Sequence, residues 1–95
     1  IPDMIQSFSC KDTAALFAGA NVRRFTNIRA GAERKFQMQH RAFRLDDLKI
    51  PPQNRLEKMR GDRAGQWSIR INNQWRLCFR FDEGNAFDVE IVDYH

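Results

Sequence analysis

The chain has 95 residues, 42% of them hydrophobic, and a formal net charge of +4 at pH 7. This length fits one domain with its own core, and no apolar run approaches the roughly 18 to 20 residues that cross a membrane. We therefore expect a single cytoplasmic domain over residues 4–95, with residues 1–3 set apart as an added remnant because they precede Met4. Cys10 and Cys78 lack the spacing of metal ligands and are expected to be free thiols.

The N-terminal half predicts one short strand and two helices. Residues 4–8 alternate in polarity as a strand does, and Ser9 begins a four-residue capping box for a short helix that runs to Phe17. A second helix is predicted from an N-cap at Thr26 to about Arg44, with an apolar stripe of Ile28, Ala32, Phe36 and Phe43. Its basic residues form either a solvated face or a surface that helps to hold RNA or the ribosome.

The C-terminal half predicts a sheet. Residues 54–59 are expected to form a strand, and alternating runs over 66–72 and 75–81 predict a hairpin. A further turn leads to a last strand that extends the apolar face through Phe87, Val89 and Ile91. The order predicts an α+β domain, with two N-terminal helices packed on one face of a mostly antiparallel, four- to five-stranded twisted sheet. The other face of this sheet is expected to stay polar and basic.

Positive charge is concentrated in the predicted hairpin region. Seven basic residues and two acids lie between Arg55 and Arg80, whereas residues 81–95 hold five acids and no lysine or arginine. Such segregation favours an acidic partner, with nucleic acid first, an acidic protein second and an anionic membrane surface third.

Strand register creates a like-charge pair in the hairpin. Keeping both apolar sets on one face places Arg70 directly opposite Arg76, and like charges at such positions destabilise a sheet. Either neighbouring acids or a bound anion such as phosphate must offset this pair. The same register pairs Arg80 with Asp88, so a cross-strand ion pair is the favoured explanation of Arg80.

The candidate reactive groups suit RNA cleavage. No glycine-rich phosphate loop, metal-binding histidine motif or nucleophile elbow is present, so no metal or cofactor is expected. In RNA the 2′-OH is the nucleophile, and a protein needs to orient it, move protons and stabilise the phosphorane. Arginine suits the last task because its planar guanidinium matches two phosphate oxygens. Glu57 and His95 are candidates for proton transfer, although an ion pair and a frayed terminus are the ordinary roles of such residues.

Three segments carry a resemblance to a known family. They are MIQSF from Met4, LEKMRGDRAGQWSIRINNQWRLCFRF from Leu56 to Phe81, and the ending DVEIVDYH from Asp88. Together they resemble the HigB toxins of the RelE superfamily, the toxic halves of bacterial toxin–antitoxin pairs. The resemblance implies a RelE-like microbial ribonuclease fold and ribosome-dependent cleavage of translated mRNA. It also implies partners, namely a HigA-like helix-turn-helix antitoxin, the ribosome and mRNA, with operator DNA bound only through the antitoxin and no membrane.

The resemblance also implies a reaction centre. Position by position, it falls on Glu57, Arg60, Arg76, Asp93, Tyr94 and His95, with RNA or phosphate contacts from Lys58, Arg63 and Arg70. The better-studied branch of the family has His and Lys in place of Glu57 and Arg60. Glu57 can act as a base but not as a cation, so the assignment of general acid and base stays open, and Arg60 is expected to bind phosphate. Tyr94 is expected to stack on a nucleobase or orient the 2′-OH.

Two other functions are compatible with the residues alone. A non-catalytic RNA- or ribosome-binding module would use the same basic face and show salt-dependent binding without cutting RNA. A DNA-binding repressor is disfavoured, because the sequence has no helix-turn-helix pattern.

Overall fold

The computed structural model describes residues 5–42, 44–50 and 52–94. Two helices, α1 (Lys11–Phe17) and α2 (Arg29–Arg41), precede an antiparallel sheet whose four strands follow chain order: β1 (Glu57–Lys58), β2 (Trp67–Arg70), β3 (Trp75–Asp82) and β4 (Asn85–Asp93). Short 3-10 turns lie between them: η1 (Arg23–Ile28), η2 (Leu45–Lys49), η3 (Pro52–Asn54) and η4 (Gly61–Arg63). This arrangement confirms the expected α+β class. Within the described part, none of the helices has the length and apolar character to cross a membrane.

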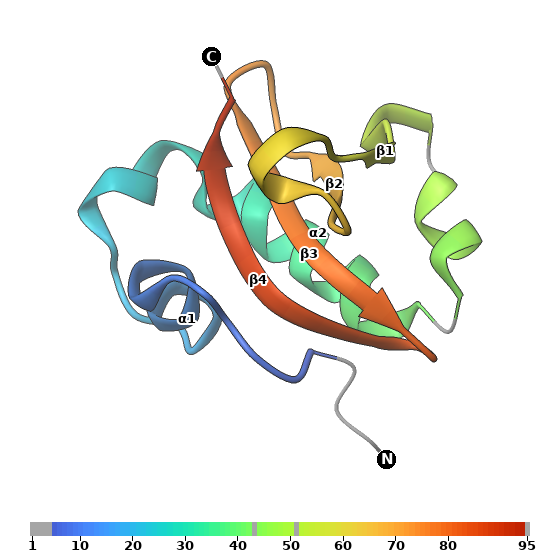
Figure 1. Cartoon of the computed structure of the whole chain (residues 1–95). Coiled ribbons are helices and arrows are strands. Elements are labelled where there is room, and N and C mark those ends of the chain that lie inside the picture. Colours follow the sequence, from blue (N-terminus) through green and yellow to red (C-terminus); the bar gives the residue numbers. More distant parts are fainter. Residues whose placement is uncertain (1–4, 43, 51, 95) are drawn as a thin grey trace.

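The core lies between one face of the sheet and the two helices. In Figure 1, α2 crosses behind the strongly curved β3–β4 ribbon. The buried cluster includes residues of both helices, of the turn η1 and of three strands: Leu16, Ile28, Ala32, Phe36, Ile69, Leu77, Phe79, Val89 and Ile91. The predicted apolar stripe is thus confirmed at its first three positions, and Phe43, the fourth, lies outside the described residues.

The predicted capping box at Ser9 is wrong. Helix α1 begins after Cys10, and no side chain caps it. The Ser9 hydroxyl instead lies 3.2 Å from both the Asp88 carbonyl oxygen and the Glu90 carboxylate, because the segment before α1 runs beside β4. Cys10 and Cys78 are free thiols, as predicted.

The strand predicted over residues 4–8 is reduced to two isolated bridges. Ile5 pairs in parallel with Ala86, and Phe8 pairs in parallel with Val89. A parallel neighbour on β4 extends the sheet without forming a regular fifth strand. Met4, the predicted first residue of this strand, lies outside the described residues.

The second helix begins later and ends earlier than predicted. Thr26 does not cap it, because the Thr26 hydroxyl donates to the carbonyl oxygen of Arg23 inside the preceding turn η1. Helix α2 then runs from Arg29 to Arg41. Arg44, the predicted end, is the N-cap of η2, where its N–H donates to the Asp47 carboxylate.

The strand predicted over residues 54–59 is also shorter than expected, because its first residues are tied to the helical layer. The Asn54 side chain is fully buried, accepts a 2.6 Å hydrogen bond from Lys35 and donates to the carbonyl oxygen of Leu48. Arg55 follows with a left-handed φ of 45°, which no regular strand contains. Only the two residues of β1 therefore pair with β2.

The sheet face opposite the core, predicted to be polar and basic, is partly covered by the chain itself. Arg70 lies directly opposite Arg76, as the register predicted. Ser68 and Cys78, however, are fully buried on this face. Figure 1 shows the reason, because the connection from β1 to β2 folds across the front of the sheet. Met59, within that connection, is buried as well.

A β-bulge changes the predicted pairing of β3 with β4. Asp88 has a φ of 54°, and the register shifts there, so that Arg80 lies opposite Phe87 rather than Asp88. Phe87 therefore leaves the apolar face, and the fully buried Ala86 lies in its place, opposite Phe81, which packs against the core. The predicted ion pair survives, because Arg80 Nε lies 3.2 Å from the Asp88 carboxylate.

Candidate active site

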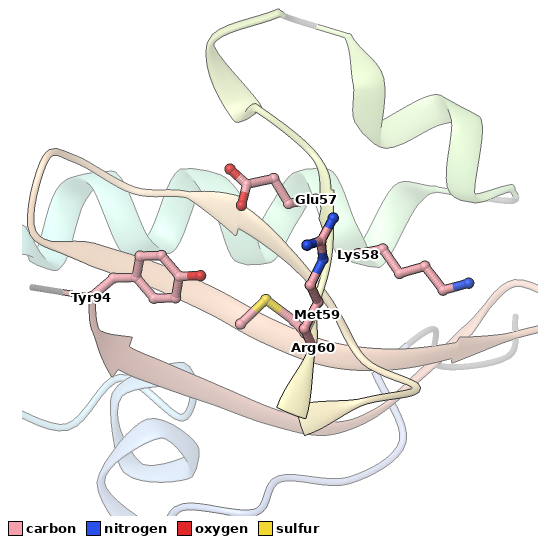
Figure 2. Close-up of a pocket in the computed structure, with 5 residues that line it drawn as sticks. All are labelled: Glu57, Lys58, Met59, Arg60 and Tyr94. Atoms are coloured by element: carbon pink, nitrogen blue, oxygen red, sulfur yellow. The ribbon is translucent and has the colours of Figure 1, made fainter. Parts of the chain in front are cut away.

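Two adjoining hollows, both lined by Glu57 of β1 and by Tyr94, which follows β4, together form what we call the basic groove. The wide lobe, of about 750 Å³, is lined by Glu57, Lys58, Met59, Arg60 and Tyr94. The narrow lobe, of about 310 Å³, is lined by Arg55, Glu57, Arg70, Asn72, Asn73, Arg76 and Tyr94. Figure 2 shows Glu57 and Tyr94 on the same side of β1, whereas Lys58 extends to the other side.

Local hydrogen bonds place Tyr94 in the groove. The Asn72 side chain accepts hydrogen bonds of 2.8 Å from the N–H groups of Gln74 and Trp75, which fixes the turn between β2 and β3. The Gln74 carbonyl oxygen then accepts the N–H of Tyr94. The turn thus anchors Tyr94, the residue that follows β4, and this residue, which is 46% exposed, lines both lobes.

Arg76 is the most firmly held side chain in the groove. It is only 6% exposed, and its Nε donates to the Ser68 hydroxyl at 2.8 Å. Its Nη2 donates to the backbone carbonyl oxygens of Ser68 and Arg55. On the groove side, its guanidinium carbon lies 5.5 Å from the centre of the Tyr94 ring, and its Nη1 lies 3.8 Å from the Glu57 carboxylate.

Positive charge in the groove is only partly offset. Among the described lining residues there are five cations and one carboxylate, that of Glu57. Arg70 donates to the amide oxygen of Asn73, which is neutral. Positive charge also reaches α2, where burial, followed by repulsion from Arg34 and Arg70, lowers the pKa of Lys35. The like-charge pair Arg70 and Arg76 therefore contributes to a site that favours binding of an anion.

The structure brings most of the predicted site residues together. Glu57, Lys58, Arg60, Arg70, Arg76 and Tyr94 all line the basic groove. Asp93 and Arg63 are not among its lining residues. Gln74 donates to the Asp93 carboxylate at 3.1 Å, and Arg63 forms a 3.2 Å ion pair with Glu90. His95 lies outside the described residues.

Sequence reasoning missed several residues of the site. Arg55 and Asn73 line the narrow lobe, and Ser68 binds Arg76 beneath it. The sequence predicts a tight turn after residue 71. This turn gives a weak indication that Asn72 and Asn73 lie beside the site. The left-handed backbone of Arg55 and the buried position of Ser68 carry none, because both depend on how β1 packs on β2.

A family model decides the relationship of the chain to known proteins. The model describes the RelE-like toxin HigB of type II toxin–antitoxin systems, and it matches residues 19–95. The chain belongs to this HigB-like toxin family. The resemblance inferred from the sequence is therefore confirmed.

Individual relatives agree with this membership. Toxin HigB-1 of Vibrio cholerae is 42% identical over 56 residues, which cover 59% of each chain. Endoribonuclease HigB of Proteus vulgaris is 42% identical over 41 residues, which cover 43% of this chain and 45% of the relative. These matches span about half the length of both HigB relatives. An uncharacterized protein of Haemophilus influenzae is 31% identical over 70 residues, which cover 74% of this chain and 68% of that protein.

Solved structures show the same fold. A chain of the YoeB–YefM complex from Staphylococcus aureus matches with a TM-score of 0.60 and 15% sequence identity, covering 96% of this chain and 97% of that one. At this identity the likeness concerns the fold alone. With the family match, it confirms the RelE-like architecture expected for a HigB-like toxin.

Proposed function

We propose that this HigB-like toxin is an endoribonuclease that cleaves mRNA in the basic groove during translation. The observation that carries the proposal is the buried guanidinium of Arg76, which faces the groove between Glu57 and Tyr94. Preorganised cationic donors of this kind stabilise charge that develops on a reacting phosphate. Membership of the HigB-like family, and a relative named Endoribonuclease HigB, support the same activity.

The proposed reaction uses the 2′-OH of RNA as the nucleophile. Glu57, half-exposed at the junction of the lobes, accepts its proton, and Arg76 stabilises the negative charge on the phosphorane. Arg60 and Lys58 hold neighbouring phosphates, and Tyr94 stacks on a base beside the scissile bond. The proton for the leaving 5′-oxygen is assigned to the ending 93–95. Because the nucleophile is part of the RNA, the protein has to align it and accept its proton. We therefore propose a reaction in which side chains perform these tasks without a metal ion.

Dependence on the ribosome is part of the proposal. The groove is open to solvent, and its charged lining among the described residues consists of cations and one carboxylate. Such a surface binds the RNA backbone but does little to impose a bent conformation on it. In-line attack by the 2′-OH needs a specific backbone geometry, which the decoding ribosome imposes on mRNA. We further propose cytoplasmic action and neutralisation by a HigA-like helix-turn-helix antitoxin, through which the complex reaches operator DNA.

A translating extract tests the activity. Wild-type protein should produce new mRNA 5′ ends inside codons, and these ends should disappear when ribosomes are removed. Arg60→Ala should lower kcat/KM for cutting about 10- to 100-fold through weaker RNA binding, because a charge-assisted hydrogen bond contributes about 1.5 to 3 kcal/mol. Arg23→Ala is the matched control, since Arg23 is an exposed arginine at the start of η1 and does not line the groove.

Intact mRNA after incubation of wild-type protein with translating ribosomes would overturn the proposal. If the protein still bound ribosomes or RNA under those conditions, it would be a non-catalytic binding module. Arg76→Ala should abolish cutting, and Arg76→Lys separates loss of charge from loss of guanidinium shape. Circular dichroism of each variant verifies that the fold persists.

A further inference from the structure

The direction of the Arg76 side chain is set by a neighbour on β2. Ser68 lies one strand away and is fully buried. Its hydroxyl oxygen accepts the Arg76 Nε–H at 2.8 Å, and its backbone carbonyl oxygen accepts from Nη2 at 3.3 Å. Two contacts from one residue therefore hold two different nitrogens of the guanidinium.

A third contact comes from the loop before β1. The Arg55 carbonyl oxygen also accepts from Arg76 Nη2. Arg55 has a left-handed φ of 45°, a conformation that is unfavourable for a non-glycine residue. The surrounding structure must compensate for this cost, and the hydrogen bond to the buried guanidinium is one compensating interaction.

These contacts leave one edge of the guanidinium for the groove. Its Nε–H and its Nη2 group are occupied by Ser68 and Arg55, so Nη1 is the remaining donor group. The described group facing Nη1 is the Glu57 carboxylate at 3.8 Å, which is beyond hydrogen-bond length. Nη1 therefore presents its two N–H groups to the narrow lobe, where a phosphate oxygen would be bound.

We propose that Ser68 is a positioning residue that aims Arg76 Nη1 at the scissile phosphate. The proposal rests on the proposed function, because the phosphate is that of the cleaved RNA. Without the Ser68 hydroxyl, a buried Nε–H loses its acceptor, and the guanidinium rotates to find another. The rotation moves Nη1 away from the phosphorane, which lowers the rate of the chemical step more than the affinity for RNA.

Three variants test this role. Ser68→Ala removes the acceptor, Ser68→Thr restores a hydroxyl in a strand-compatible residue, and Ser7→Ala is the matched control. Ser7 also accepts a hydrogen bond through its hydroxyl, at 2.9 Å from the Asp88 N–H, but it lies on the segment before α1. Ser68→Ala should lower kcat about 10- to 100-fold, as expected for a lost charge-assisted hydrogen bond, while KM changes by less than about threefold.

A second measurement does not depend on cleavage. In ¹⁵N NMR spectra, the Arg76 Nε–H of the wild-type protein should be shifted and slow to exchange with water, because it is buried and bonded. Ser68→Ala should speed its exchange at least about tenfold, as expected for an opened buried site, whereas Ser68→Thr and Ser7→Ala should leave it slow.

The outcomes separate the two proposals. Cleavage by wild type at an unchanged kcat in Ser68→Ala would overturn the role of Ser68 and leave the proposed function intact. A wild-type protein that cuts nothing, but shows the protected Nε–H, would overturn the function and with it this role. A fall in kcat without faster Nε–H exchange, or an equal fall in Ser7→Ala, would mean that Ser68 acts through general stability. Should Ser68→Thr fail to fold, the comparison of Ser68→Ala with Ser7→Ala still decides whether Ser68 positions Arg76.

Discussion

The arginines of the basic groove differ in how firmly the fold holds them. Arg76 is buried and bonded to Ser68, whereas Arg60 is exposed, with no ion pair in the described part of the chain. A fixed guanidinium is suited to charge that develops at one position, and a free one adapts to a flexible line of phosphates. We therefore expect Arg76 to affect the rate of reaction and Arg60 to affect RNA binding.

Tyr94 presents an exposed aromatic side chain in the groove. Tyr94 is 46% exposed as a residue, and its ring packs beside the Arg76 guanidinium. Tyr94→Ala should weaken binding of single-stranded RNA about 5- to 150-fold, because stacking on one base contributes about 1 to 3 kcal/mol. Tyr94→Phe keeps the ring and should bind like wild type. Fluorescence anisotropy with a labelled RNA measures both, and equal weakening in the two variants would assign the effect to the hydroxyl.

Lys35 predicts a pH dependence of stability. Burial is the main cause that lowers its pKa from 10.5 in the folded protein. Between that lowered pKa and 10.5, the unfolded chain binds more protons at Lys35 than the folded chain does, so stability rises with pH in this window. Relative to Lys35→Met, wild type should therefore gain stability as pH rises toward 10.5. Urea unfolding across alkaline pH measures the difference, and a gap independent of pH would contradict the prediction.

At the scale of elements, a buried hydrogen bond links α1 to the sheet, in addition to their packing in the core. Thr13 is fully buried, and its hydroxyl oxygen accepts the N–H of Ile91 on β4 at 3.0 Å. Thr13→Val keeps the shape but leaves that N–H without its acceptor, which should cost about 1 to 3 kcal/mol of unfolding free energy. Thr26→Val is the control, because the Thr26 hydroxyl bonds only within its own exposed turn. Urea denaturation compares them, and equal midpoints would show that the bond contributes nothing.

The strands that the sequence predicts well are those with a regular period of two. Runs 66–72 and 75–81 contain β2 and most of β3, because alternate side chains face the core. The missed features depend on tertiary contacts instead. Ser9 bonds β4 rather than capping α1, and the left-handed Asp88 moves Phe87 off the apolar face. No local sequence pattern marks either change. A serine that caps a helix cannot be told by sequence from one that bonds a strand, and a bulged residue cannot be told from one in regular pairing.

The same distinction applies to the site. Resemblance to the HigB toxins predicted six of the residues that line the groove, and the antiparallel return of β4 explains how they meet. This return brings Tyr94 back to the turn that precedes Arg76. Ser68 and Arg55 were missed as site residues because their role is to hold Arg76, and that role depends on the packing of three separate segments.

At the scale of the whole molecule, acidic residues of β4 neutralise two basic residues outside the groove. Arg63 pairs with Glu90, and Arg80 pairs with Asp88, each at 3.2 Å. The acidic C-terminal segment thus compensates cations on one part of the sheet. The cations that line the groove keep an excess over Glu57, so a modest net charge of +4 is concentrated where RNA is proposed to bind.

This distribution predicts which arginines determine the salt dependence of RNA binding. Each phosphate contact to single-stranded RNA should contribute about −0.7 to the slope of log K against log salt, because binding releases a counterion. Arg60→Ala should therefore make the slope shallower by about 0.7. Arg80→Ala should leave it unchanged, since Arg80 is already paired with Asp88. Affinities measured over a series of KCl concentrations give both slopes. A larger change for Arg80→Ala than for Arg60→Ala would place the RNA along the outer part of the β3–β4 hairpin instead of in the basic groove.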